Sequence, residues 1–166
     1  LPRQLSGNML KINALISILP DNDRFSVAFQ LRNSPSHAKE AVNFIYIFTD
    51  LVEQCFLAGN GNLNGTGNGL ANVLTGNGAA NTIRSMRGND TLAGAAGTDR
   101  LFGGAGADSL NGGSGADAMT GGTGADRFVF ASALGGGNVD RVTDFNTAAD
   151  LILLDNAVFT RLAVGT

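Results

Sequence analysis

The chain has 166 residues, of which 24 are glycine and one is cysteine, and its formal net charge is −3. This length is enough for one ordinary domain, and the mildly acidic charge without a basic run argues against a nucleic-acid partner. The single cysteine excludes an internal disulfide bond, and no apolar run approaches the roughly eighteen residues of a membrane span. Because much of the chain is glycine, alanine and asparagine, we expect an elongated monomeric module without a deep core.

Residues 1–57 differ in composition from the rest of the chain and contain no short repeat. They form an N-terminal segment whose fold the sequence leaves uncertain, interpreted as a possible remnant of a larger domain. An apolar run rich in β-branched and aromatic residues around Ile45–Phe48 predicts a buried strand followed by irregular chain. The alternative is a helix with one apolar side, formed by Val42, Ile45, Thr49 and Val52.

Residues 58–84 contain two weak copies of a nine-residue unit, GNGLANVLT (67–75) and GNGAANTIR (76–84). Both have an apolar residue at the eighth position and asparagine at the sixth, Asn72 and Asn81. An amide offers a carbonyl oxygen but no charge, so these units should continue a stacked structure with little or no metal. The preceding residues 58–67 share the composition without the period, and a flexible linker or a further coil fits them equally well.

Residues 85–129 repeat the unit G-G-x-G-x-D-x-U-x five times, where U is a large apolar residue. The units are SMRGNDTLA, GAAGTDRLF, GGAGADSLN, GGSGADAMT and GGTGADRFV. The fourth position is always glycine, the sixth is always aspartate, and the eighth is Leu92, Leu101, Leu110, Met119 or Phe128.

Each fixed position has a physical role. Glycines allow positive-φ backbone whose carbonyl oxygens turn inward, and the aspartate adds an anionic oxygen to them. Calcium takes six to eight such oxygens in a tolerant geometry, whereas magnesium demands a stricter octahedron. The apolar residue opens a short strand, so two units complete a coil that stacks at about 4.8 Å. Asp90, Asp108 and Asp126 should therefore line one edge of the stack, and Asp99 and Asp117 the other.

These five units resemble the repeats-in-toxin (RTX) family, the hemolysin-type calcium-binding repeat of secreted bacterial proteins. The resemblance implies an all-β, right-handed parallel β-roll with a β-rich C-terminal cap, and several calcium ions between successive turns of one edge. The implied metal ligands are the carbonyls or carboxylates of Gly88, Asp90, Gly94, Gly97, Asp99, Gly103, Gly104, Gly106, Asp108, Gly112, Gly113, Gly115, Asp117, Gly121, Gly122, Gly124 and Asp126. Ser85, Met86 and Ala95 replace glycines in the first two units, whose turns should bind most weakly.

Residues 130–166 are expected to form a C-terminal cap. Over residues 128–154, FVF, DRVTDF and ADLILLD look like the closing segment of RTX proteases and related exoproteins, with apolar strands in FVF and ADLILL. The resemblance makes Asp140 and Asp150 candidate ligands of a final calcium ion, although solvated turn residues fit equally well. Asp144 is expected to be structural. The ending LAVGT lacks the acidic residue and apolar terminus of a type I secretion signal, which predicts a truncated or missing signal.

No catalytic constellation is apparent. His37 is expected in an exposed loop, and Cys55 is expected to be a small buried apolar residue. The glycine-rich stretches lack the Lys-Ser/Thr pair of a phosphate-binding loop, and no HExxH motif occurs. The resemblance thus implies a calcium-triggered folding module, non-catalytic by itself, of a secreted, extracellular protein exported by a type I secretion apparatus if its signal is intact. The alternatives are a fragment of an RTX enzyme of protease, lipase or epimerase type, and an adhesive or surface solenoid.

Overall fold

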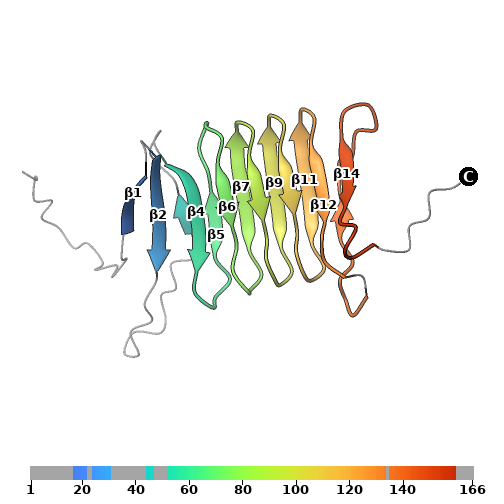
Figure 1. Ribbon diagram of the computed structural model, residues 1–166, viewed down its shortest axis with the longest axis horizontal. Coiled ribbons are helices and arrows are strands. Elements are labelled where there is room, and N and C mark those ends of the chain that lie inside the picture. Colours follow the sequence, from blue (N-terminus) through green and yellow to red (C-terminus); the bar gives the residue numbers. More distant parts are fainter. Residues whose placement is uncertain (1–16, 22–23, 31–43, 47–51, 134, 160–166) are drawn as a thin grey trace, which may run out of the picture.

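The computed structural model describes residues 17–21, 24–30, 44–46, 52–133 and 135–159, and every element in them is a strand. The strands stack along the long axis in two layers joined by narrow turns, as in a flattened solenoid (Figure 1). The first sheet has eight strands, in the order β1 (Ser17–Asp21), β2 (Arg24–Gln30), β4 (Val52–Ala58), β6 (Val73–Thr75), β8 (Thr91–Ala93), β10 (Ser109–Asn111), β12 (Arg127–Phe130) and β14 (Leu151–Leu154). The second sheet has six, in the order β13 (Arg141–Val142), β11 (Ala118–Thr123), β9 (Arg100–Ala105), β7 (Thr82–Arg87), β5 (Asn64–Thr66) and β3 (Phe44–Tyr46).

The pairing register repeats once per coil of two nine-residue units. In the second sheet Leu101 of β9 pairs with Ile83 of β7 and with Met119 of β11, in parallel. In the first sheet Leu110 of β10 lies between Leu92 and Phe128 in the same way. The predicted parallel β-solenoid with an eighteen-residue coil is therefore confirmed.

The core is a narrow row of apolar side chains between the two sheets. Its buried members are Cys55, Leu57, Leu63, Leu74, Ile83, Leu92, Leu101, Leu110, Met119 and Phe128. From Leu74 on they occupy the eighth position of each unit, as the sequence predicts. Full burial of such a side chain contributes roughly 1.5–3 kcal/mol. A core this thin makes the chemistry of the turns important for stability.

The strands before residue 58 belong to the same two sheets as the repeats. The strand predicted around Ile45–Phe48 is confirmed over residues 44–46, where β3 pairs in parallel with β5. The irregular chain expected after it is wrong for residues 52–56, which lie in β4 between β2 and β6. Buried Cys55 and Leu57 alternate with exposed Phe56, a strand period that the neighbouring polar Glu53 and Gln54 obscure in the sequence.

For residues 58–67, where a linker and a coil fitted equally well, the structure contains a coil. Residues 64–66 form β5, which pairs with β7 in the same parallel sheet, and Leu63 is part of the core. The predicted loop position of His37 lies outside the described residues.

The C-terminal strands predicted from FVF and ADLILL are confirmed by β12 and β14, and β13 is a further strand within DRVTDF. β12 pairs with β14 and β11 pairs with β13, so the cap continues both sheets. The ring of Phe145 lies 6.0 Å from that of Phe128, centroid to centroid, and covers the last core residue. The described part of the chain contains no helix long and apolar enough to cross a membrane.

Candidate metal centre

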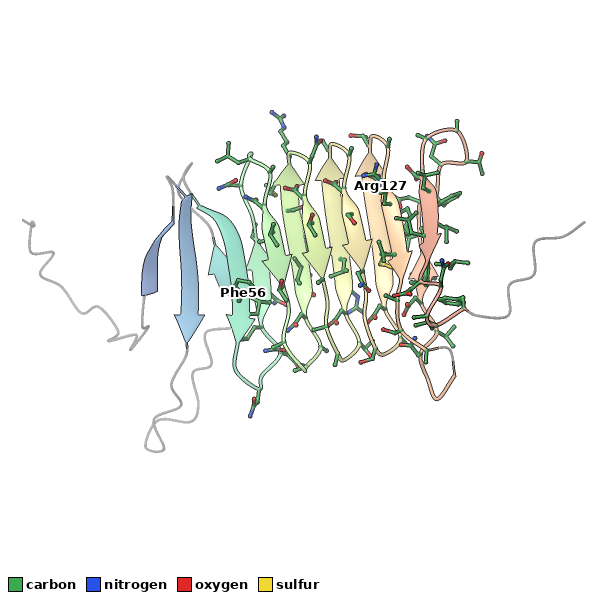
Figure 2. All side chains as sticks on the ribbon, viewed as in Figure 1. Phe56 and Arg127 are labelled. Atoms are coloured by element: carbon green, nitrogen blue, oxygen red, sulfur yellow. The ribbon has the colours of Figure 1, made fainter. Side chains whose placement is uncertain are left out.

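The aspartates of the repeats form two ladders, one on each edge of the solenoid. On the first edge the backbone N–H of Asp90 donates to Oδ1 of Asp108 at 2.8 Å, and that of Asp108 donates to Oδ1 of Asp126 at 3.0 Å. On the second edge the N–H of Asp99 donates to Oδ1 of Asp117 at 2.7 Å. The predicted distribution of the five aspartates over two edges is confirmed. Figure 2 shows side-chain oxygens along both rows of turns.

Both ladders extend beyond the five units. At their start the backbone N–H groups of Asn72 and Asn81 donate to Oδ1 of Asp90 and Asp99, at 2.6 and 2.7 Å. At their end the N–H of Asp117 donates to Asp140, and that of Asp126 donates to Asp150, both at 3.0 Å. These last partners are 23 and 24 residues apart in sequence, because longer loops in the cap take up the additional residues.

The second carboxylate oxygen of each repeat aspartate is buried without a hydrogen-bond partner. These orphaned atoms are Oδ2 of Asp90, Asp99, Asp108, Asp117 and Asp126, and each of the five residues is at most 2% exposed. A buried carboxylate oxygen without a partner is strongly destabilising, since desolvation is not compensated. The folded turns therefore require a proton or a cation at five equivalent places.

Burial raises the pKa of these carboxyl groups. It raises the pKa of Asp99 to about 7 despite the N–H of Asn81, which lowers it, and the charge of Asp117 adds to the increase. It raises the pKa of Asp108 to about 6, and the stacked charges of Asp90 and Asp126 add to this increase. Burial also raises the pKa of the other three repeat aspartates above its ordinary value. Stacked carboxylates in this roll therefore resist ionisation unless a cation accompanies them.

The glycines beside these carboxylates lie against carboxylate and carbonyl oxygens, too close for a Cβ. A Cβ at Gly94 would collide with Oδ2 of Asp99 and with the carbonyl oxygen of Gly112 in the next coil. At the fourth position of a unit, a Cβ at Gly106 would collide with the carbonyl oxygen of Gly88. The predicted positive φ is confirmed for the second- and fourth-position glycines of the third to fifth units and is wrong for the first-position glycines. The first position still requires glycine, because at Gly94 a carboxylate oxygen and a carbonyl oxygen of the next coil leave no room for a Cβ.

These residues fit a calcium ion. The described residues contain no group of three or more His, Cys, Asp or Glu side chains that could hold a metal. Carboxylates alone are therefore too few, and backbone carbonyls would have to complete the coordination. Calcium accepts such a mixture of carboxylate and carbonyl oxygens in a flexible geometry. An orphaned carboxylate oxygen beside a carbonyl-lined space meets this requirement.

The first two units depart from the glycine pattern in different ways. Met86 and Ala95 replace the second glycine but keep its positive φ, at 87° and 81°, so the turn conformation is preserved. Ser85 replaces the first glycine, and its buried hydroxyl donates to the carbonyl oxygen of Gly103 at 2.6 Å. That hydroxyl also lies beside Asp90 and lowers the pKa that burial raises. The carbonyl oxygen of Gly103 thus already accepts a hydrogen bond in the turn of Asp90.

The three aspartates of the cap have different environments. Asp140 is half-buried and uses one oxygen to accept the N–H of Asp117. Both oxygens of Asp150 accept backbone N–H groups, from Asp126 at 3.0 Å and from Asn146 at 2.8 Å. Asp144 accepts the N–H groups of Gly121 and Gly122 at 2.9 and 2.8 Å, which gives it the structural role that the sequence predicts.

Cys55 has the predicted surroundings of a small apolar residue. It is 2% exposed, and burial raises the pKa of its thiol to about 11. The thiolate that a nucleophile requires is therefore suppressed at neutral pH.

Sequence comparison agrees with this geometry. Residues 66–101 and 94–128 match the RTX calcium-binding nonapeptide repeat, a family described in blocks of 4 copies. The match includes the two asparagine units and all five repeat aspartates. Comparisons with curated proteins and with solved structures found no match.

Proposed function

We propose that this chain is a calcium-triggered folding module of a secreted bacterial protein and is non-catalytic by itself, because residues 66–128 match the RTX calcium-binding nonapeptide repeat. The observation that carries the proposal is the set of five buried, partnerless carboxylate oxygens. Each lies in a turn whose glycines leave carbonyl oxygens close by.

The aspartates would hold calcium in stacked pairs along each edge. The best three sites are those between Asp90 and Asp108, between Asp99 and Asp117, and between Asp108 and Asp126. Carbonyls of the glycine positions would complete each site. Asp140 extends the second ladder and remains a candidate ligand beside Asp117. Asp150 extends the first ladder, but a calcium ion there would have to displace the N–H of Asn146.

Calcium would offset the repulsion between carboxylates that are stacked at strand spacing. Two carboxylates about 5 Å apart repel by roughly 3 kcal/mol at an effective dielectric constant near 20. The ligands come together only in the stacked coils, so binding and folding are coupled. The chain's own residues contribute the remaining steps: the apolar eighth positions pack, and the Oδ1 ladder fixes the register of successive coils.

This coupling suits export through a narrow channel. At the low free calcium of a bacterial cytoplasm the repeats would stay unfolded and could pass through a type I secretion apparatus. Outside the cell millimolar calcium would fold them and oppose backward sliding. Co-expression of the chain with such an apparatus, followed by its recovery from the medium, tests this part. Recovery from the cells alone would contradict it.

Titration calorimetry of the full chain with calcium and with magnesium tests the metal assignment. We expect a calcium response on the order of 10⁻⁴–10⁻³ M, typical of extracellular modules, and a much weaker response to magnesium. An equal response to both ions, or none to calcium, would overturn the assignment.

A further inference from the structure

Three turns of the roll are closed by hydrogen bonds from their backbone to their own asparagine or aspartate side chains. In residues 68–72 the N–H of Asn68 donates to Oδ1 of Asn72 at 2.9 Å, and Oδ1 of Asn68 accepts the N–H of Leu70 at 2.9 Å. Residues 77–81 repeat both bonds, from Asn77 to Asn81 at 2.8 Å and from Ala79 to Asn77 at 2.9 Å. Residues 146–150 repeat them again, from Asn146 to Asp150 at 2.8 Å and from Ala148 to Asn146 at 3.1 Å.

The three closed turns share a sequence pattern that the calcium-repeat pattern does not contain. They read NGLAN, NGAAN and NTAAD. Each begins with asparagine at the second position of the unit, where the third, fourth and fifth aspartate units have glycine. The fourth position is leucine or alanine instead of glycine. Asparagine is suited to the second position because its side chain bonds to the backbone two residues later.

The backbone differs between closed turns and the aspartate turns. In the third unit Gly104 and Gly106, at the second and fourth positions, have φ of 107° and 142°. No residue of the three closed turns has positive φ. In a closed turn the backbone N–H of the second residue of the unit donates a hydrogen bond to a side-chain oxygen of the sixth residue. In the five aspartate turns of residues 85–129, the corresponding Oδ2 has no partner.

We infer that the residue at the second position selects whether a turn requires calcium, so that residues 64–84 fold without the ion and serve as the base on which the aspartate coils assemble. This inference rests on the proposed calcium-binding function, because it divides the repeats into those that need calcium to fold and those that do not. The closed turn at residues 146–150 ends the calcium-dependent part at its other end.

The packing of the base supports its independence from calcium. Half of the ten buried apolar residues in the described part of the chain lie in coils without a repeat aspartate, namely Cys55, Leu57, Leu63, Leu74 and Ile83. The amide of Asn81 also donates to the carbonyl of Leu63 at 2.9 Å, and that of Asn77 donates to the carbonyl of Gly61 at 2.9 Å. The closed turn at residues 77–81 thus fastens its coil to the preceding coil through neutral groups.

The base also presents two donors that fix the first aspartate coil. The N–H groups of Asn72 and Asn81 point at Oδ1 of Asp90 and Asp99, at 2.6 and 2.7 Å. Hydrogen bonds to a charged acceptor are stronger than neutral ones. A folded base therefore sets the register of the first calcium-dependent turn on each edge, and folding proceeds from residue 84 toward the C-terminus.

Hydrogen exchange of the full chain, measured by mass spectrometry in chelator and in calcium, tests the inference. In chelator we expect amides of residues 64–84 to exchange at least about tenfold more slowly than those of residues 94–126. In calcium both regions should be protected. Equal exchange of the two regions in chelator would overturn the inference.

A triple variant tests whether the residues that distinguish a closed turn from an aspartate turn, including the second position, determine the need for calcium. Asn77→Gly, Ala79→Gly and Asn81→Asp together rewrite one closed turn as an aspartate turn. In chelator the amides of this turn should lose their protection against hydrogen exchange, and calcium should restore it. Loss that calcium does not restore, or no loss at all, would overturn the inference. Ala95→Gly, which changes an open turn that already has positive φ, is the matched control and should leave residues 64–84 protected in chelator.

The same experiment separates this inference from the proposed function. If calorimetry shows no calcium binding by the unmodified chain, the proposed function fails whatever the exchange pattern. If the chain binds calcium but residues 64–84 exchange in chelator as fast as residues 94–126, only the closed-turn inference fails.

Discussion

The backbone N–H of Asp108 donates to Oδ1 of Asp126 at 3.0 Å, across 18 residues of sequence. One oxygen of Asp126 thus holds two coils in register, while the other is buried without a partner. In the other four repeat aspartates, too, Oδ1 accepts a backbone N–H of the preceding coil and Oδ2 is buried without a partner. Each carboxylate is thus a structural link, and its second oxygen is the one proposed to bind calcium.

We expect Asp108→Asn to weaken calcium binding more than Asp90→Asn. The asparagine keeps an oxygen for the ladder but removes the charge, and Asp108 belongs to two of the proposed stacked pairs. Asp90 lies at the start of its ladder, beside Ser85. Calorimetry should show an affinity loss of at least about tenfold, or ~1.4 kcal/mol, for Asp108→Asn and a smaller loss for Asp90→Asn. Equal losses would contradict the proposal that two calcium sites share Asp108.

Ser85→Gly should improve calcium binding at the first aspartate turn. The substitution removes the hydroxyl that donates to the carbonyl of Gly103 at 2.6 Å and restores the repeat pattern. We expect a calcium midpoint lower than that of the unmodified chain when folding is followed by circular dichroism. Ser114→Gly, at an exposed third position, is the control for the added glycine and should change the midpoint less. A midpoint that rises with Ser85→Gly would show that the hydroxyl assists the site.

The periodic part of the molecule follows from its sequence. Fixed aspartate and apolar columns determine which residues lie on each edge and which form the core, because one coil corresponds to two units. The strand at residues 52–58 was not predictable in the same way, since Glu53 and Gln54 interrupt its apolar alternation.

The sequence also left the roles of the cap and the asparagine turns open. Asp140 and Asp150 enter the ladders at separations of 23 and 24 residues, which a period of eighteen cannot anticipate. The closure of a turn by Asn68, Asn77 or Asn146 depends on backbone φ as well as on residue type. The recurrence of N-x-x-A followed by Asn or Asp was the available signal.

In chelator the folded roll should be favoured by acid. Burial raises the pKa of Asp99 to about 7 and that of Asp108 to about 6, from the ordinary 3.8. Between the ordinary pKa of 3.8 and these raised values, the folded state binds more protons than the unfolded state. The free energy of unfolding in chelator therefore falls as the pH rises through this range. Circular dichroism in chelator should show more β-structure near pH 5 than near pH 8. A β signal that increases with pH in chelator would contradict this assignment.

Truncation of a core side chain should destabilise the calcium-bound roll. Leu101 is fully buried between two strands of the second sheet, and Leu101→Ala should lower the free energy of unfolding by about 2–5 kcal/mol. Leu151→Ala, at a position 53% exposed on β14, is the control and should change it by about 0.5 kcal/mol or less. Urea denaturation at saturating calcium measures both. Similar effects of the two substitutions would contradict the core described here.

Circular dichroism of the full chain, first in chelator and then with millimolar calcium at pH near 7.5, tests the central claim most directly. The account predicts a spectrum in chelator with only a minor β contribution, from the calcium-independent coils. Calcium should then produce a large, saturable increase in β-structure, as residues 85–155 fold. A full β spectrum in chelator, unchanged by calcium, would show that the roll is stable without the ion and would contradict the calcium-triggered folding proposed here.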